Sequence, residues 1–226
     1  MTAAIILSGG SGLRMGTEIP KQYLEVSGKP VIAYCIDTFE KSPEIDKIVI
    51  VCAEEYRMLI SNLFTESTKF AGFAAPGSNR QLSILSGLNA LKNILGEEDD
   101  VVIHDAARPN VSHETVRRIT EELKNYDAVL PVLPMKDTVY EAEDGKVISN
   151  LDRSRIVAGQ APEGFKFGAY LRANEALLPD KINEISGSMQ PAVMAGMHVG
   201  TIPGDENNYK ITTPADLARF EEETCG

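Results

Sequence analysis

The chain has 226 residues, of which 43% are apolar, and its 33 acidic side chains outnumber its 22 basic ones to give a formal net charge of −11. This length and apolar content are ordinary for one α/β domain, whereas the acidic balance argues against a nucleic-acid-binding protein, which would need positive charge to neutralise phosphates. The cysteines are far apart, and we find no signal-peptide pattern or membrane-length apolar run, so we expect a cytoplasmic protein with no zinc site, disulfide or membrane contact.

Strand-like and helix-like segments alternate along most of the chain. Short apolar runs rich in β-branched residues are typical of strands buried on both faces, and apolar residues spaced three and four apart are typical of helices. In chain order, the pattern predicts a strand over 3–7, a helix over 31–39, a strand over 47–51, a helix over 54–64, a strand over 70–74, a helix over 81–95, a strand over 101–104, a helix capped by Ser112 and reaching Lys124, a strand over 128–132, and a last helix from Thr213 to about Glu223. This alternation predicts an open, doubly wound, mostly parallel α/β sheet, in which ligands bind beyond the carboxyl ends of the strands.

The segment 134–150 departs from this alternation. Residues 138–141 and 147–149 have the pattern of two short strands around a turn that contains Gly145, so we expect a β-hairpin. A hairpin that projects from an α/β core can contact a second subunit, or it can be a plain surface feature. The pattern alone leaves both possibilities open.

A glycine-rich segment, Ser8 to Gly12, follows the first strand directly and precedes two cations, Arg14 and Lys21. Glycines allow main-chain N–H groups to approach an anion closely, and the cations add positive charge, so the expected ligand is a polyphosphate. Met15 occupies the position of the last glycine in the dinucleotide fingerprint, and no Gly-Lys-Ser/Thr follows as it would in a P-loop. A glycine turn without a ligand and an NAD-dependent oxidoreductase remain as alternatives.

Motifs spread over nearly the whole chain resemble those of one family. LSGGSGLRMG and PKQY, near the start, resemble the signature of nucleotidyltransferases that activate sugar and polyol phosphates. The further matching segments, in the same order, are NRQLSI at 79–84, HDAARP at 104–109, Asp137-Thr138, Asp152-Arg153, GQAPEGF at 159–165 and YKITTP at 209–214. Together they resemble the polyol-phosphate cytidylyltransferases, which include the enzymes for 2-C-methyl-D-erythritol 4-phosphate and for ribitol 5-phosphate.

The resemblance implies a Rossmann-like fold, with 1–226 as a single nucleotidyltransferase domain and a hairpin arm at about 134–155 that forms a homodimer. It also implies the transfer of CMP from CTP to a sugar-alcohol phosphate, which yields a CDP-polyol and pyrophosphate, with Mg²⁺ as cofactor held largely by substrate oxygens. A phosphate monoester is already largely dianionic at neutral pH, so the attacking oxygen needs no catalytic base.

The same resemblance assigns the site residues. It implies catalytic roles for Arg14 and Lys21 on the CTP phosphates. The remaining nucleotide-binding positions that it implies are Leu7, Ser8, Gly9, Gly10, Ser11, Gly12, Gly77, Arg80, Ser83, Asp105 and Ala106. The acceptor-binding positions that it implies are Asp105, Arg108, Thr138, Arg153 and Lys210, with Arg153 reaching into the neighbouring subunit's site. It names no protein ligand for the metal, and we interpret His104 as a structural residue.

Two segments on the acceptor side depart from the family's usual pattern. A Gly-Gln-Thr-Pro-Gln type of segment here reads GQAPE at 159–163, so a hydroxyl is lost and Glu163 replaces an amide. A Thr-Asp-acidic-or-small-Ala stretch here reads ISGSMQPA at 185–192, so an acid is lost. The acceptor stays open between methylerythritol phosphate, which belongs to isoprenoid biosynthesis, and ribitol 5-phosphate or another polyol phosphate used for a cell-wall or surface polymer. A non-catalytic nucleotide-binding homologue is the remaining alternative.

Overall fold

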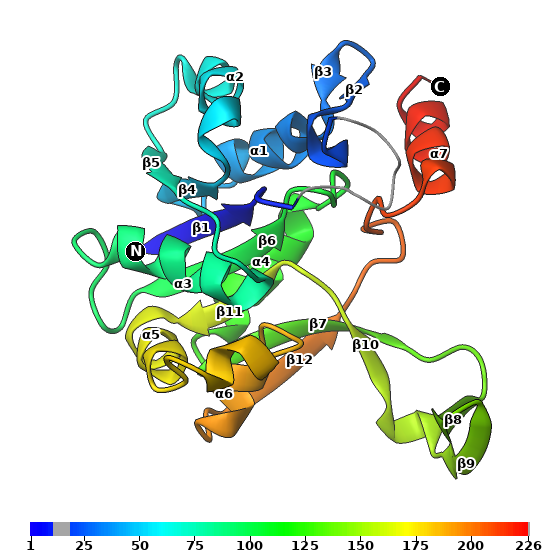
Figure 1. Cartoon of the computed structure of the whole chain (residues 1–226). Coiled ribbons are helices and arrows are strands. Elements are labelled where there is room, and N and C mark those ends of the chain that lie inside the picture. Colours follow the sequence, from blue (N-terminus) through cyan, green and yellow to red (C-terminus); the bar gives the residue numbers. More distant parts are fainter. Residues whose placement is uncertain (11–18, 226) are drawn as a thin grey trace.

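The computed structural model describes residues 1–10 and 19–225, and its main feature is a central sheet with helices on both sides (Figure 1). Within these residues the sheet has the strand order β10-β7-β11-β6-β1-β4-β5, with β12 paired to β7. Its strands are β1 (Thr2–Leu7), β4 (Lys47–Val51), β5 (Phe70–Ala74), β6 (Asp100–Asp105), β7 (Ala128–Pro134), β10 (Val157–Gly159), β11 (Glu163–Lys166) and β12 (Val199–Pro203). The pairs among β1, β4, β5 and β6 are parallel, as is β12 with β7, whereas β10 and β11 run antiparallel to their neighbours.

The helices divide between the two faces of this sheet. One face carries α1 (Val31–Lys41), α2 (Arg57–Ser61) and α4 (His113–Glu122), and the other carries α3 (Arg80–Leu91), α5 (Phe167–Glu175) and α6 (Gln190–Met194). The last helix, α7 (Pro214–Cys225), packs against the small hairpin of β2 (Glu25–Val26) and β3 (Lys29–Pro30). No helix in the described part of the chain combines the length and the apolar character that crossing a membrane requires.

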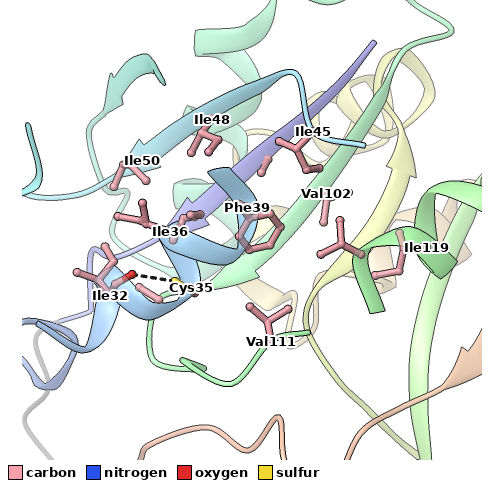
Figure 2. Close-up of a cluster of buried hydrophobic side chains, with 14 of the residues drawn as sticks. Ile32, Cys35, Ile36, Phe39, Ile45, Ile48, Ile50, Val102, Val111 and Ile119 are labelled. Atoms are coloured by element: carbon pink, nitrogen blue, oxygen red, sulfur yellow. Dashed lines mark hydrogen bonds between the residues drawn. The ribbon is translucent and has the colours of Figure 1, made fainter. Parts of the chain in front are cut away.

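The two faces explain why the first strand is apolar throughout. Ala4 and Ile6 belong to the hydrophobic cluster under α1 and α4, whereas Ala3 and Ile5 belong to the cluster under α3 and α5. Figure 2 shows the first cluster, in which side chains of α1 pack against residues of the sheet such as Ile48, Ile50 and Val102. A strand covered on both faces cannot alternate between apolar and polar residues, so the continuous apolar pattern correctly predicts this burial.

The predicted fold class, a doubly wound and mostly parallel α/β sheet, is confirmed. The strands predicted at 47–51 and 70–74 have the observed bounds, and the Ser112 hydroxyl caps α4 by accepting from the Thr115 N–H at 3.2 Å. The helix predicted at 81–95 ends at Leu91, although Leu95 is still buried in the turns that follow. The single helix predicted over 54–64 is wrong, because α2 covers only Arg57–Ser61 between two short 3₁₀ turns.

The predicted hairpin is present as β8 (Val139–Glu143) and β9 (Lys146–Leu151), which pair only with each other among the described strands. Asp144 and Gly145 have φ values of 48° and 76°, the left-handed pair that a two-residue hairpin turn requires. In Figure 1 the hairpin projects away from the sheet beyond β7 and β10. We call this projecting segment, residues 134–155, the arm.

Candidate active site

The parallel strands β5, β4, β1 and β6 end side by side at one edge of the sheet. The Cys52 N–H donates to the Ala74 carbonyl at 3.1 Å, and the Ser8 N–H donates to the Val51 carbonyl at 2.8 Å. The Ala106 N–H in turn donates to the Leu7 carbonyl at 3.0 Å. These bonds hold together the loops that carry most of the predicted site residues, at the edge where α/β sheets bind ligands.

The described part of the glycine segment, Ser8 to Gly10, is fixed by the 3₁₀ turn Lys21–Tyr23. The Gln22 side-chain amide donates to the carbonyl oxygens of Ser8 and Gly10 at 2.9 and 2.8 Å. The Tyr23 hydroxyl donates to the same Ser8 carbonyl at 3.0 Å. Lys21 is buried in this turn, so the fold brings its backbone beside the glycine segment. The predicted residues Ser11, Gly12 and Arg14 lie outside the described residues.

Replacement of Gly9 by alanine is expected to lower the free energy of unfolding by about 1–3 kcal/mol, because overpacking forces neighbouring atoms apart. A Cβ added at Gly9 would lie 2.4 Å from the Cβ of Pro76, on the loop after β5. Gly10→Ala is the matched control, since no described atom lies within 4 Å of a Cβ at that position. Urea unfolding of both variants measures the difference, and equal stability of the two would contradict the expected contact.

The loop after β5 and the start of α3 are shaped by Gly77 and Ser83. The Ser83 hydroxyl accepts from the Gly77 N–H at 3.0 Å and donates to the Asn79 carbonyl at 2.9 Å, while the Asn79 side chain caps α3 at the Leu82 N–H. A Cβ on Gly77 would approach the Cβ of Leu82 to 2.4 Å. Both predicted residues therefore support the shape of this loop, and their contact with a nucleotide stays a prediction.

Asp105, the last residue of β6, is the centre of a cluster of cations that we call the Asp105 cluster. Its Oδ1 accepts from Arg80 Nε and Nη2 at 3.2 and 3.1 Å, and its Oδ2 accepts from Lys210 Nζ at 2.9 Å. The Arg108 Nε lies 3.9 Å from Asp105 Oδ2. Burial alone would raise the pKa of Asp105, but the charges of Arg80 and Lys210 outweigh it and hold that pKa well below its usual range. Asp105 is thus a carboxylate that orients cations from separate segments of the chain.

The loop before α7 is tied to the loop after β6. Arg108 Nη1 donates to the Asn208 carbonyl at 2.6 Å, and the Ile211 N–H donates to the Ala107 carbonyl at 2.8 Å. These two bonds flank Lys210 and explain how it reaches Asp105. His104 is buried, its Nε2 lies 3.0 Å from the Arg108 carbonyl, and burial lowers its pKa to about 4. His104 is therefore neutral at pH 7 and supports the loop after β6 through its contact with the Arg108 carbonyl.

The predicted acceptor residues Thr138 and Arg153 lie on the arm, apart from the Asp105 cluster of the same chain. Thr138 is exposed just before β8. Arg153 is also exposed, and its guanidinium donates to the Lys136 carbonyl at 2.8 Å within the arm. The arm projects away from the sheet (Figure 1), and among the described residues no hydrogen bond or ion pair joins Thr138 or Arg153 to the Asp105 cluster of the same chain.

Sequence reasoning assigned no structural role to several buried polar residues that hold the site together. Gln160 exchanges hydrogen bonds with the backbone of Asp205 at 2.9 and 3.0 Å, and Glu163 accepts from the Ser188 hydroxyl. Gln22, described above, has the same kind of role. Gln22, Gln160 and Glu163 all lie inside the motifs quoted for the family, and a polar residue within such a motif was the signal that could have identified them.

The metal-binding capacity of this edge is small. Within residues 1–10 and 19–225, no three His, Cys, Asp or Glu side chains are grouped so that they could hold a metal ion. Asp105 already accepts hydrogen bonds from Arg80 and Lys210. Mg²⁺ prefers oxygen ligands and commonly keeps those of substrate phosphates. A divalent ion at this edge would therefore depend mainly on the oxygens of a bound phosphate compound.

Comparison with known proteins identifies relatives along the whole chain. The family model described as IspD, 2-C-methyl-D-erythritol 4-phosphate cytidylyltransferase, matches residues 2–223. The chain is 34% identical over 221 residues to the 2-C-methyl-D-erythritol 4-phosphate cytidylyltransferase of Geobacter metallireducens, a match that covers 96% of this chain and 95% of that protein. It is 33% identical over 218 residues to the bifunctional enzyme IspD/IspF of Paramagnetospirillum magneticum. That match covers 96% of this chain but 55% of the relative, so the chain spans about half the length of such bifunctional proteins.

The solved structures agree with the sequence relatives. The 4-diphosphocytidyl-2C-methyl-D-erythritol synthase of Anaerococcus prevotii matches with a TM-score of 0.84 and 25% identity, over 100% of this chain and 98% of that one. The bifunctional IspDF of Campylobacter jejuni matches with a TM-score of 0.76 and 25% identity, over 96% of this chain and 53% of that one. The chain therefore belongs to the 2-C-methyl-D-erythritol 4-phosphate cytidylyltransferase (IspD) family of nucleotidyltransferases.

Proposed function

We propose that this protein transfers CMP from CTP to 2-C-methyl-D-erythritol 4-phosphate, producing the corresponding CDP-alditol and pyrophosphate. Family membership supports a cytidylyltransferase, and the Geobacter metallireducens relative carries this name over nearly its whole length. The observation that carries the proposal is the meeting of the Ser8–Gly10 segment and the Asp105 cluster at one sheet edge. Amide groups beside several cations can hold two phosphate compounds close together, which is what this reaction requires.

The chemistry needs no proton-transfer residue. A phosphate oxygen of the acceptor attacks the α-phosphorus of CTP, and the bond from that phosphorus to the oxygen shared with the β-phosphate breaks. The acceptor phosphate is largely dianionic at neutral pH, so no base has to remove a proton first. The protein instead has to bring two anions together and stabilise the charge that develops on the leaving pyrophosphate.

We assign the triphosphate to the glycine segment and to Arg14 and Lys21. The Gln22 and Tyr23 hydrogen bonds support this assignment for Lys21, because they anchor its turn against Ser8. The remaining nucleotide-binding assignments are Leu7, Ser8, Gly9, Gly10, Ser11, Gly12, Gly77, Arg80, Ser83, Asp105 and Ala106. A divalent ion such as Mg²⁺ would neutralise triphosphate charge when bound with CTP.

We assign the acceptor to the other side of the same cluster. Arg108 and Lys210 would bind its phosphate, and Asp105 would hold both cations in place and accept hydrogen bonds from the polyol hydroxyls. The two hydrogen bonds that flank Lys210 support this assignment, because they fix its backbone to the loop after β6.

We propose that the arm forms a homodimer and that it carries Thr138 and Arg153 into the partner's site. A two-stranded hairpin alone is marginally stable in water, so β8 and β9 need a packing surface. Tyr140, Val147 and Ile148 on the hairpin are 56%, 67% and 55% exposed, and such apolar exposure on a projecting arm supports burial against a second subunit.

Pyrophosphate release is the direct test of the proposed reaction. The purified protein is supplied with CTP, UTP or GTP, with Mg²⁺, and with methylerythritol phosphate or ribitol 5-phosphate as acceptor. We expect turnover with CTP and methylerythritol phosphate, and loss of that turnover when EDTA is added. If ribitol 5-phosphate is turned over and methylerythritol phosphate is not, the protein is still a cytidylyltransferase but its acceptor is ribitol 5-phosphate. Absence of turnover with every pair would favour a non-catalytic nucleotide-binding homologue.

A further inference from the structure

Glu163 is a buried acid beneath the candidate site that the proposed reaction does not use. It is the first residue of β11, is 8% exposed, and is in register with Ile103 of β6, two residues before Asp105. Its carboxylate accepts a hydrogen bond from the Ser188 hydroxyl. The Ser188 carbonyl accepts from the Tyr170 hydroxyl at 2.6 Å, so Ser188 is fixed from two sides.

Glu163 and Ser188 lie in the two segments in which the sequence departs from the family's usual pattern. The segment 159–163 gains an acid, and the segment 185–192 lacks one. In the folded chain the two segments contact each other through the Glu163–Ser188 hydrogen bond. Residues 185–192 contain no charged side chain, so Glu163 of β11 supplies the negative charge where these two segments meet.

The charge of Glu163 acts on the cations of the Asp105 cluster. Burial raises the pKa of Glu163, while Arg80 and the Ser188 hydrogen bond oppose that rise. Glu163 also adds to Asp105 in raising the pKa of Arg80, which burial alone would lower, and it acts in the same direction on Arg108. Asp105 alone cannot balance the cations around it, so an ionised Glu163 lowers the excess positive charge of the cluster by one.

We propose that Glu163 is a positioning residue, whose buried carboxylate is the second counter-charge of the Asp105 cluster and limits how tightly the cluster binds the acceptor phosphate. The inference rests on the proposed function, which assigns that phosphate to Arg108 and Lys210. Binding energy that is equal in substrate and transition state does not raise kcat, so a cluster with more positive charge would hold phosphate more tightly without a faster reaction.

The ionisable groups near Glu163 determine how the charge of the Asp105 cluster changes with pH. In the Asp105 cluster itself, Asp105 stays ionised, and His104, the residue before it, stays neutral above about pH 5 because burial lowers its pKa to about 4. Burial also raises the pKa of Tyr170, which stays neutral. The charged and titratable groups that act on Glu163 are Arg80 on α3, Asp105 at the end of β6, Arg108 after β6 and Tyr170 on α5.

The test is the affinity for inorganic phosphate, a stand-in for the acceptor phosphate, of the whole wild-type chain and of Glu163→Gln. Affinities are compared at the same pH, so that the titration of phosphate itself cancels in the ratio. At about pH 8 we expect Glu163→Gln to bind phosphate roughly 3–10-fold more tightly, the effect of one charge at short range in a partly solvated site. The ratio of the phosphate affinity of Glu163→Gln to that of the wild type should fall toward one as the pH decreases, because wild-type Glu163 then gains a proton. In turnover assays, the KM for the acceptor should fall without a rise in kcat.

Two further variants sharpen the result. Glu66→Gln removes the same charge from an exposed position just before β5, the outermost strand, which β6, β1 and β4 separate from β11. This variant should leave the phosphate affinity within about twofold of the wild type. Ser188→Ala keeps Glu163 but removes the hydrogen bond that lowers its pKa. Glu163 should then be protonated at a higher pH, so that, as the pH is lowered, phosphate binding should tighten at a higher pH than in the wild type. This variant keeps the proposal testable if Glu163→Gln does not fold.

A ratio of one at pH 8 for Glu163→Gln, or one that does not change with pH, would overturn the counter-charge role. If the protein turns over CTP but the affinity ratio is one, only the proposed role of Glu163 is wrong. If no nucleotide is turned over but the affinity ratio exceeds one at pH 8 and falls at lower pH, the proposed function is wrong and the counter-charge role stands.

Discussion

Replacement of Asp105 by asparagine is expected to lower the free energy of unfolding by about 2–4 kcal/mol at neutral pH, since removal of one partner leaves buried charge uncompensated. The loss should fall below that of a fully enclosed pair, because the Arg80 and Lys210 side chains are 35% and 34% exposed and can regain water. The variant should also lose about 100-fold in kcat/KM, because both cations lose their common anchor. Urea unfolding and pyrophosphate release measure the two effects.

The stability loss should depend on pH in a defined direction. The folded-state pKa of Asp105 lies below its usual value, so its ionised form contributes stability above the unfolded pKa of about 3.9, and that contribution is lost as the pH falls through the folded value. Wild type and Asp105→Asn should therefore differ fully at pH 5–7, and the difference should begin to shrink below about pH 4.

An exposed ion pair is the control for this prediction. Glu114 on α4 accepts hydrogen bonds from Arg117 and Arg118, but its side chain is 49% exposed. Glu114→Gln should leave the stability nearly unchanged, since solvent screens exposed pairs. Equal stability of Asp105→Asn and wild type at neutral pH would show that Asp105 does not hold the cluster together.

The parallel half of the sheet could be predicted because burial leaves a direct trace in sequence. β1 and β4 are covered on both faces, so they read as unbroken apolar runs. The Asp-Gly turn of the arm is similarly local, because only a few residue types adopt left-handed φ values without strain.

Two of the strands that pair with β7, β11 and β12, could not be predicted from local pattern. β11 has the sequence EGFK, and its place between β6 and β7 is decided by pairing with distant residues. β12 contains a glycine and ends in a proline, which weakens any strand signal. Neither strand is long or regular enough to be recognised before its partners are known.

The same limit applies to the candidate site. Its cations stand next to recognisable motifs, so Arg80, Arg108 and Lys210 could be selected from the sequence. Which residues would pair could not be predicted, because Lys210 meets Asp105 across 105 residues and Ser188 meets Glu163 across 25. Polar contacts at such separations depend on the finished topology rather than on sequence spacing.

Lys21→Ala and Arg153→Ala are each expected to lower kcat/KM by at least about 100-fold, because each removes a cation assigned to the binding of a substrate. Arg155→Ala is the matched control, since Arg155 is an exposed arginine on the same 3₁₀ turn as Arg153. We expect it to keep activity within about twofold. Pyrophosphate release at saturating CTP, followed over a range of acceptor concentrations, separates kcat from KM.

Heterodimers of the two inactive variants test where Arg153 acts. Arg153 and Thr138 stand on a projecting arm, and in the proposed homodimer this arm would complete the site of the partner rather than that of its own chain. In a heterodimer, one site then has both substitutions and the other has neither, so about half of the wild-type activity should return. Variants carrying different affinity tags and purified in tandem allow the heterodimer to be measured alone. If verified heterodimers stay inactive, Arg153 does not act across the interface, and the arm would then serve assembly alone.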